Sequence, residues 1–171
     1  MSALAQLETT LANIFKPAPN LPKNVREALA KAWPWVTLVC AILQLLGAWA
    51  LWGLLTAADR MSDYAFYYTR DTYSFSSGEK MIVYAAAALL VVEGVLLLMA
   101  FSELQKRSAR GWRLVFLVAV LNVLYSITVL LIRDRGFGSF FLNGIASVIG
   151  FYLLFQLKPL FKAKARKAPR V

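Results

Sequence analysis

The chain has 171 residues, of which 60% are apolar and only 16% are charged. This composition, with a mean hydropathy of +0.60, excludes an ordinary water-soluble domain and predicts a polytopic membrane protein. The net charge of +10 would suggest nucleic acid in a soluble protein. Here the basic residues flank apolar segments, so lipid headgroups and membrane topology explain them better.

Several reactive residue types are scarce. The chain has no histidine, and its single cysteine, Cys40, lies inside an apolar segment. An internal disulfide is therefore excluded, and imidazole cannot act as an acid, a base or a metal ligand. The sequence also lacks a Walker loop, a nucleophile elbow and a metal-spaced acid cluster. We therefore expect no enzyme activity, no cofactor and no metal site.

Residues 1–33 are predicted to form a cytoplasmic amphipathic segment with two helices. The first helix has apolar residues at helical spacing, namely Leu4, Leu7, Leu11, Ile14 and Phe15. A proline-rich break at 16–22 separates it from a second short helix at 23–33. Two interpretations are open: the helices anchor the chain at the membrane surface or beneath the bundle, or they form an arm that docks a partner.

Four apolar segments have the length of about 20 residues that a bilayer crossing requires. Their ranges are about 34–58, 81–104, 112–132 and 137–157. Their interiors lack the alternation of barrel strands, so helices are expected, because only these two structures satisfy the backbone in lipid. The predicted fold class is an all-α membrane protein. It comprises a four-helix transmembrane bundle over 34–158 with N-terminal amphipathic interfacial helices.

Lys and Arg are divided unequally between the two sides of these segments. Four precede the first segment, four lie between the second segment and the start of the third, Arg113 included, and six follow the fourth, from Lys158 through the basic tail at 159–171. The two remaining loops hold three and two. The positive-inside rule therefore places both termini in the cytoplasm. The tail is expected to bind anionic lipid headgroups.

The predicted outside loop, 59–80, is rich in aromatic residues. They are Tyr64, Phe66, Tyr67, Tyr68, Tyr73 and Phe75. Aromatic side chains of this kind usually form a belt at the headgroup level. A lid over the bundle, or a contact surface for an extracytoplasmic partner, is the alternative interpretation.

A single carboxyl group, Glu93, lies near the centre of the second segment. Because an ionised carboxylate there costs about 2.5–3.5 kcal/mol, we expect Glu93 to be protonated and to face protein. Every other segment has polar residues at a similar depth: Gln44, Asn122 and Ser147, with Asn143 one turn outward from Ser147. We predict that these five residues form an intramembrane polar layer.

Small residues indicate where helices approach closely. The second segment contains Gly94, and the fourth contains Ala146 and Gly150 at the small-xxx-small spacing. The two segments are therefore expected to pack tightly, with each other or across a dimer.

The polar layer has competing interpretations. As a contact between helices it would fix their register, each hydrogen bond contributing about 0.6 kcal/mol. As a proton or cation site it would serve a small carrier or channel, but four segments leave little room for a pathway. We therefore expect a non-catalytic accessory or scaffold subunit; the alternative is an oligomeric small-solute or proton-linked transporter or channel that uses Glu93. Expected partners are membrane lipids and a homo-oligomer or larger membrane complex, and not nucleic acid.

Four stretches resemble a group of small uncharacterised bacterial four-span membrane proteins with no assigned activity. They are the N-terminal amphipathic helix ending in IFKPAPNLP, PW entering the first span, the basic turn KRSARGW, and the ending FYLLFQLKPLFK. The resemblance covers most of the chain. It implies a bacterial cytoplasmic (inner) membrane location and adds no site residues. The tyrosine-rich loop departs from the shorter-looped members of that group.

Overall fold

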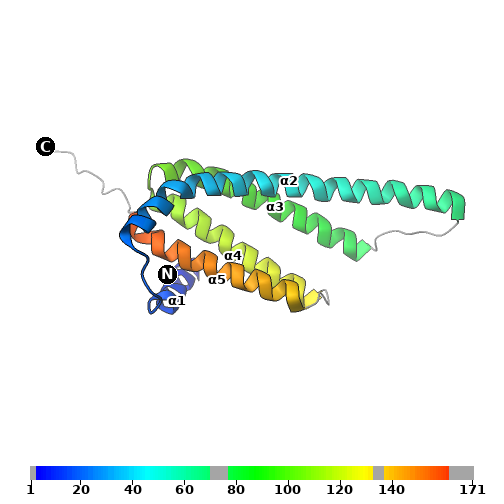
Figure 1. Cartoon of the computed structure of the whole chain (residues 1–171). Helices are drawn as coiled ribbons and strands as arrows, with labels where there is room; N and C mark the ends of the chain where they lie inside the picture. The colour runs from blue at the N-terminus through cyan, green and yellow to red at the C-terminus, as the bar shows by residue number, and fades with distance from the viewer. Residues whose placement is uncertain (1–2, 70–76, 133–136, 162–171) are drawn as a thin grey trace. The chain divides into compact units, whose positions relative to one another are not determined.

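The computed structural model describes residues 3–69, 77–132 and 137–161, and these residues are all-helical (Figure 1). The helices are α1 (Ala3–Phe15), α2 (Lys23–Thr69), α3 (Ser77–Gln105), α4 (Ala109–Ile132) and α5 (Phe137–Leu157), and a short 3₁₀ helix follows at Lys158–Leu160. The basic tail from residue 162 and the centre of the tyrosine-rich loop, 70–76, lie outside the described residues.

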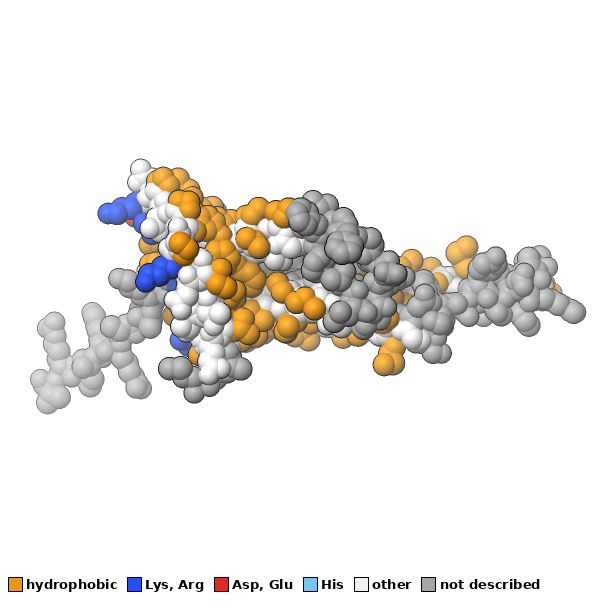
Figure 2. Space-filling model, turned by 90° about the horizontal axis from the view of Figure 1, so that it is seen from below, with side chains coloured by type: hydrophobic (Ala, Val, Ile, Leu, Met, Phe, Trp, Pro, Cys, Tyr) orange, Lys and Arg blue, Asp and Glu red, His pale blue; other side chains and the backbone are white. Residues whose placement is uncertain are grey.

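Three of these helices are long and apolar enough to cross a membrane. Within the described residues they extend over Lys23–Met61, Lys80–Gln105 and Ala109–Thr128. The described apolar stretch at Gly144–Leu160 is shorter. In the three longer helices only 17–28% of the most apolar window is buried, so most apolar side chains face outward. Figure 2 shows hydrophobic side chains over much of the described surface, with the coloured Lys and Arg side chains at the left of the view.

The prediction of a separate short helix at 23–33 is wrong. A single helix of 47 residues, α2, begins at Lys23 and continues through Pro34. Proline removes one backbone donor and its ring crowds the preceding turn, yet α2 is continuous through this position. Nearby, the buried Thr37 donates its hydroxyl hydrogen to the carbonyl of Trp33 at 2.9 Å.

The predicted loop at 59–80 is also largely helical. Helix α2 continues to Thr69, and α3 begins at Ser77. The residues of this segment include no proline, so no proline ends the helix at the apolar boundary. Loss of hydropathy marks the end of an apolar segment, not the end of a helix.

The turn between α3 and α4 is a Schellman motif. Arg107 donates its N–H to Leu104 O at 2.9 Å, and Ser108 donates to Glu103 O at 3.0 Å. Arg107 has a φ of 50°, the left-handed conformation that glycine usually supplies here. Gly111 permits the tight turn, because a Cβ at this position would lie 2.7 Å from Leu104 N.

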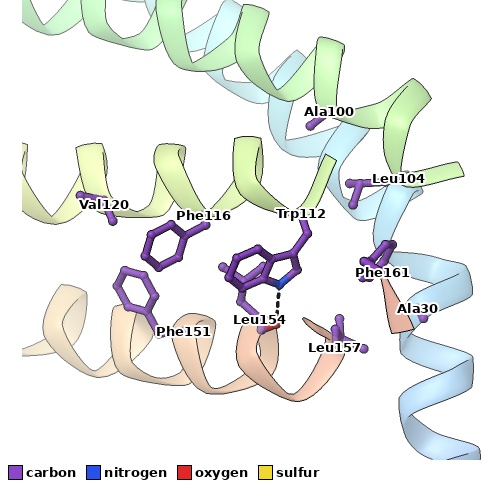
Figure 3. Close-up of a cluster of buried hydrophobic side chains, with 10 residues drawn as sticks. All are labelled: Ala30, Ala100, Leu104, Trp112, Phe116, Val120, Phe151, Leu154, Leu157 and Phe161. Atoms are coloured by element: carbon purple, nitrogen blue, oxygen red, sulfur yellow. Dashed lines mark hydrogen bonds between the residues drawn. The ribbon is translucent and has the colours of Figure 1, made fainter. Parts of the chain in front are cut away.

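The helices divide into two compact units, one of residues 1–37 and 99–171 and the other of residues 38–98. In the first unit α4 and α5 pack side by side around an aromatic core (Figure 3). The rings of Trp112 and Phe116 are stacked at 5.4 Å, and Trp112 Nε1 donates to Leu154 O at 2.8 Å. This bond satisfies the one polar atom of a buried indole.

Helix α1 packs against this core and does not stand apart from it. Leu4, Leu11 and Phe15 contact the core cluster, and the Phe15 ring stacks on Phe155 at 5.8 Å. Ile14 stays exposed. Of the two predicted positions for α1, packing against the helices is the one that the described contacts support.

Candidate functional site

The second unit is a helical hairpin in which α2 and α3 approach closely at Gly94. A Cβ on Gly94 would lie 2.9 Å from both Cγ and Cδ2 of Leu45 and 3.4 Å from Ala41 O. Ala41 is fully buried by this approach. Two residues after Leu45 on α2, Gly47 lies against Leu90. The partner of the predicted close approach at Gly94 is therefore α2; at Gly150 an added Cβ would contact nothing within 4 Å.

The close approach at Gly94 positions the neighbouring residue, Glu93, against α2. Gln44 Nε2 donates a hydrogen bond to Glu93 Oε2 at 2.9 Å, and Glu93 is only 1% exposed. A buried carboxyl group is destabilising unless it is hydrogen-bonded, and the amide of Gln44 supplies such a bond. Within the described part of the chain, Gln44 Oε1 is buried and accepts no hydrogen bond. The pair is thus a directed polar contact inside an apolar hairpin.

Contacts nearer the end at which the chain passes from α2 to α3 hold the same register. The rings of Trp52 and Tyr84 meet edge to face at 5.9 Å. Beyond them Lys80 Nζ and Asp59 Oδ1 form a half-exposed ion pair at 2.6 Å. An exposed pair of this kind contributes little energy, so the buried pair and the glycine contact carry the specificity of the hairpin.

The remaining predicted layer residues lie in the other compact unit. Asn122 is exposed, and its Nδ2 donates to Val118 O of its own helix at 3.2 Å. Ser147 is half-buried and lines an apolar groove between α1, α4 and α5. The side chain of Asn143 lies outside the described residues. The structure therefore brings Gln44 and Glu93 together, and the five-residue layer stays a prediction.

Two polar residues that the sequence interpretation missed, Tyr152 and Gln156, hold the proline-rich segment against α5. Tyr152 donates its hydroxyl hydrogen to Pro19 O at 2.6 Å, and Gln156 Nε2 donates to the same oxygen at 3.2 Å. Leu21 donates its N–H to Gln156 Oε1 at 3.4 Å. A signal was present: a segment with three prolines has backbone groups that lack helical partners and need side chains instead.

The chemistry available to these residues is hydrogen bonding and, at Glu93, protonation. Among the described residues no group of three or more Asp, Glu or Cys side chains could hold a metal ion. A single carboxyl group bonded to an amide can fix two helices together or bind one proton. It cannot by itself perform a two-residue acid–base reaction.

No family model matches the chain, and neither the curated proteins nor the solved structures give a match. The class of protein therefore follows from the fold and the site alone. The described chain is all-helical, with three helices long and apolar enough to cross a membrane. Among the described residues, the buried acid Glu93 is hydrogen-bonded between two helices, whereas many large apolar side chains face outward. These features indicate a helical membrane protein.

Proposed function

We propose that this protein is a non-catalytic accessory or scaffold subunit of the bacterial cytoplasmic membrane. It crosses the bilayer four times, through the apolar part of α2 and through α3, α4 and α5, and both termini lie in the cytoplasm. The N-terminal helix α1 lies at the cytoplasmic surface. Its partners are membrane lipids and the other proteins of a larger membrane complex.

The observation that supports a scaffold is that the intramembrane carboxyl group of Glu93 is hydrogen-bonded to another helix of the same chain. Glu93 is 1% exposed and bonded to an amide on the adjacent helix, so it serves the contact between α2 and α3. A transport site would require water or an ion to reach this group. The outward face of α2 is apolar instead, with Val39, Leu43 and Leu46 all exposed. This face is available to lipid or to helices of another subunit.

The test is purification of the full-length tagged chain in a mild detergent after crosslinking in the membrane, with quantitative mass spectrometry. A scaffold subunit copurifies with another membrane protein at a constant ratio, and Glu93→Gln retains that ratio because glutamine preserves the shape and the hydrogen-bonding capacity. A homo-oligomer with no second protein, across several detergents, contradicts the proposal.

A proton-linked transporter is the second candidate, and the observation that favours it is that Glu93 is a fully buried intramembrane acid. The variant Glu93→Gln distinguishes the two functions, because an amide cannot release a proton at physiological pH. A Gln variant that is stable but inactive in the cell identifies a proton site. A variant that is stable and active removes the transporter.

A further inference from the structure

A basic cavity lies at the end of α5, in the compact unit that contains α1, α4 and α5. It has a volume of about 330 Å³, and three cationic side chains line it: Lys16, Arg26 and Lys158. Its volume falls in the range of about 300–1,000 Å³ typical of ligand sites. The cavity is therefore large enough for a headgroup-sized anion.

The cavity has an excess of positive charge. Lys158 Nζ forms an ion pair with Glu8 Oε1 at 2.8 Å and lies 5.2 Å from the centre of the Trp112 ring. Lys16 and Arg26 form no ion pair among the described residues. Arg26 Nε is buried and has no hydrogen-bond partner there. A buried donor without a partner is costly, and a phosphate oxygen is the acceptor that a guanidinium binds best.

An apolar groove adjoins the basic cavity. It has a volume of about 350 Å³, and Phe15 lines both spaces. The groove is formed by α1, α4 and α5, with Ile127, Gly144 and Val148 along it. At Gly144 an added Cβ would meet nothing within 4 Å, so the groove is open at that point. A cationic cavity next to an apolar groove matches an amphiphile with one anionic end.

We propose that this unit binds one anionic glycerophospholipid of the cytoplasmic leaflet. Its phosphate lies between Arg26, Lys16 and Lys158, and one acyl chain lies in the groove beside Phe15 and Gly144. Basic pockets beside membrane helices on the cytoplasmic side are sites for such headgroups. The bound lipid would hold α1 against α5. The inference rests on the proposed membrane crossing of α4 and α5.

The headgroup is tested by native mass spectrometry of the full-length chain in a nonionic detergent. Phosphatidylglycerol is compared with phosphatidylcholine of the same acyl chains. The wild-type chain retains phosphatidylglycerol selectively. Arg26→Gln weakens the binding of this lipid about tenfold, which is the effect of one lost charge-assisted hydrogen bond. Arg113→Gln is the matched control, because Arg113 is exposed on α4 and does not line the cavity. If Arg26→Gln does not fold, the exposed Lys16→Gln takes its place.

The acyl chain is tested by filling the groove. The leucine side chain of Gly144→Leu projects into the groove and should weaken the binding of phosphatidylglycerol about tenfold. Gly53→Leu, on an open part of α2 where an added Cβ also meets nothing, leaves binding unchanged. Soluble glycerophosphate and inorganic phosphate are added as competitors. Displacement of the lipid by either one at equal concentration would identify a free-phosphate site and overturn the proposal.

Equal retention of both lipids, or equal losses in Arg26→Gln and Arg113→Gln, also overturns it. These outcomes leave the scaffold function intact, since that depends on a copurifying partner. Conversely, a homo-oligomer without a partner that still selects phosphatidylglycerol contradicts the scaffold and keeps the lipid site.

Discussion

At the scale of single residues, the Gln44–Glu93 hydrogen bond makes the contact between α2 and α3 specific as well as apolar. Both side chains could be replaced by apolar ones of similar size, and a well-packed apolar pair is often as stable as a buried polar pair. The polar pair instead specifies register, because only one alignment of α2 and α3 satisfies it. Glu93 is 1% exposed, so a shifted alignment would separate this buried carboxyl group from the Gln44 amide that donates to it.

Glu93→Gln should therefore leave the thermal stability in detergent unchanged, whereas Glu93→Leu should lower the free energy of unfolding by about 1–3 kcal/mol, because Gln44 loses its acceptor. The double variant Gln44→Leu/Glu93→Leu should be less destabilised than the sum of the two single variants. Additive losses would show that the two side chains do not interact.

Gly94→Ala should also destabilise the hairpin, by about 1–3 kcal/mol, because the new methyl group overlaps Leu45 at a distance of 2.9 Å. Adding Leu45→Ala should restore part of the loss, since it removes the atoms that clash. Gly53→Ala is the control, as an added Cβ there meets no atom within 4 Å. Thermal unfolding of the three variants and the wild-type chain measures the effect, and a Gly94→Ala chain as stable as the control variant would contradict the close approach.

The sequence could predict Glu93 and Gln44 as partners because apolar segments make each polar residue conspicuous and helix spacing fixes its depth. It could not predict which amide side chain would donate a hydrogen bond to Glu93. That pairing depends on how closely Leu45 approaches Gly94, where an added Cβ would lie only 2.9 Å away, and this is a property of two helices and not of one. Tyr152 and Gln156 were missed for the opposite reason: they lie near a helix end, where polar residues are ordinary.

At the scale of elements, the proline-rich segment after α1 depends on α5 for its order. Its carbonyl at Pro19 accepts hydrogen bonds from both Tyr152 and Gln156. A segment without its own backbone hydrogen bonds opens locally when such contacts are removed.

Tyr152→Phe combined with Gln156→Leu removes three hydrogen bonds to this segment. Because each contributes about 1 kcal/mol to the closed state, the double variant should speed proteolytic cleavage within residues 16–22 by about a hundredfold. Tyr84→Phe, in the other compact unit, should not change the rate. The measurement is limited proteolysis of the purified chain with a broad-specificity protease, followed by mass spectrometry. Unchanged cleavage would show that α1 alone holds the segment.

The boundaries of the elements show where hydropathy is a weak guide. The range of α5, Phe137–Leu157, coincides with the predicted apolar segment, and α4 begins three residues before its own. Helix α2 instead extends beyond the predicted segment at both ends. Hydropathy reports the solvent around a helix, whereas backbone hydrogen bonding determines where the helix begins and ends. Polar flanks of good helix formers therefore continue a helix into water without any signal in the apolar pattern.

At the scale of the whole molecule, the distribution of Lys and Arg predicts the orientation. Reporter fusions at Gly78 should report the extracytoplasmic side, and fusions at Ser108 and Val171 should report the cytoplasm, because the basic loops resist translocation. Replacing Lys106, Arg107, Arg110 and Arg113 by Gln should raise the fraction of inverted chains. A cytoplasmic signal at Gly78 in the unmodified chain would contradict the orientation.

Because α2 is one continuous helix, it is much longer than a bilayer crossing requires. At a rise of about 1.5 Å per residue, its 47 residues extend about 70 Å, against a hydrocarbon core of about 30 Å. Even the steepest ordinary tilt, about 40°, lengthens the path through the core to only about 39 Å. Nearly half of a membrane-crossing α2 must therefore stand in the headgroup zones and in water, carrying Lys23, Arg26 and Lys31 at one end and Asp59 and Arg60 toward the other.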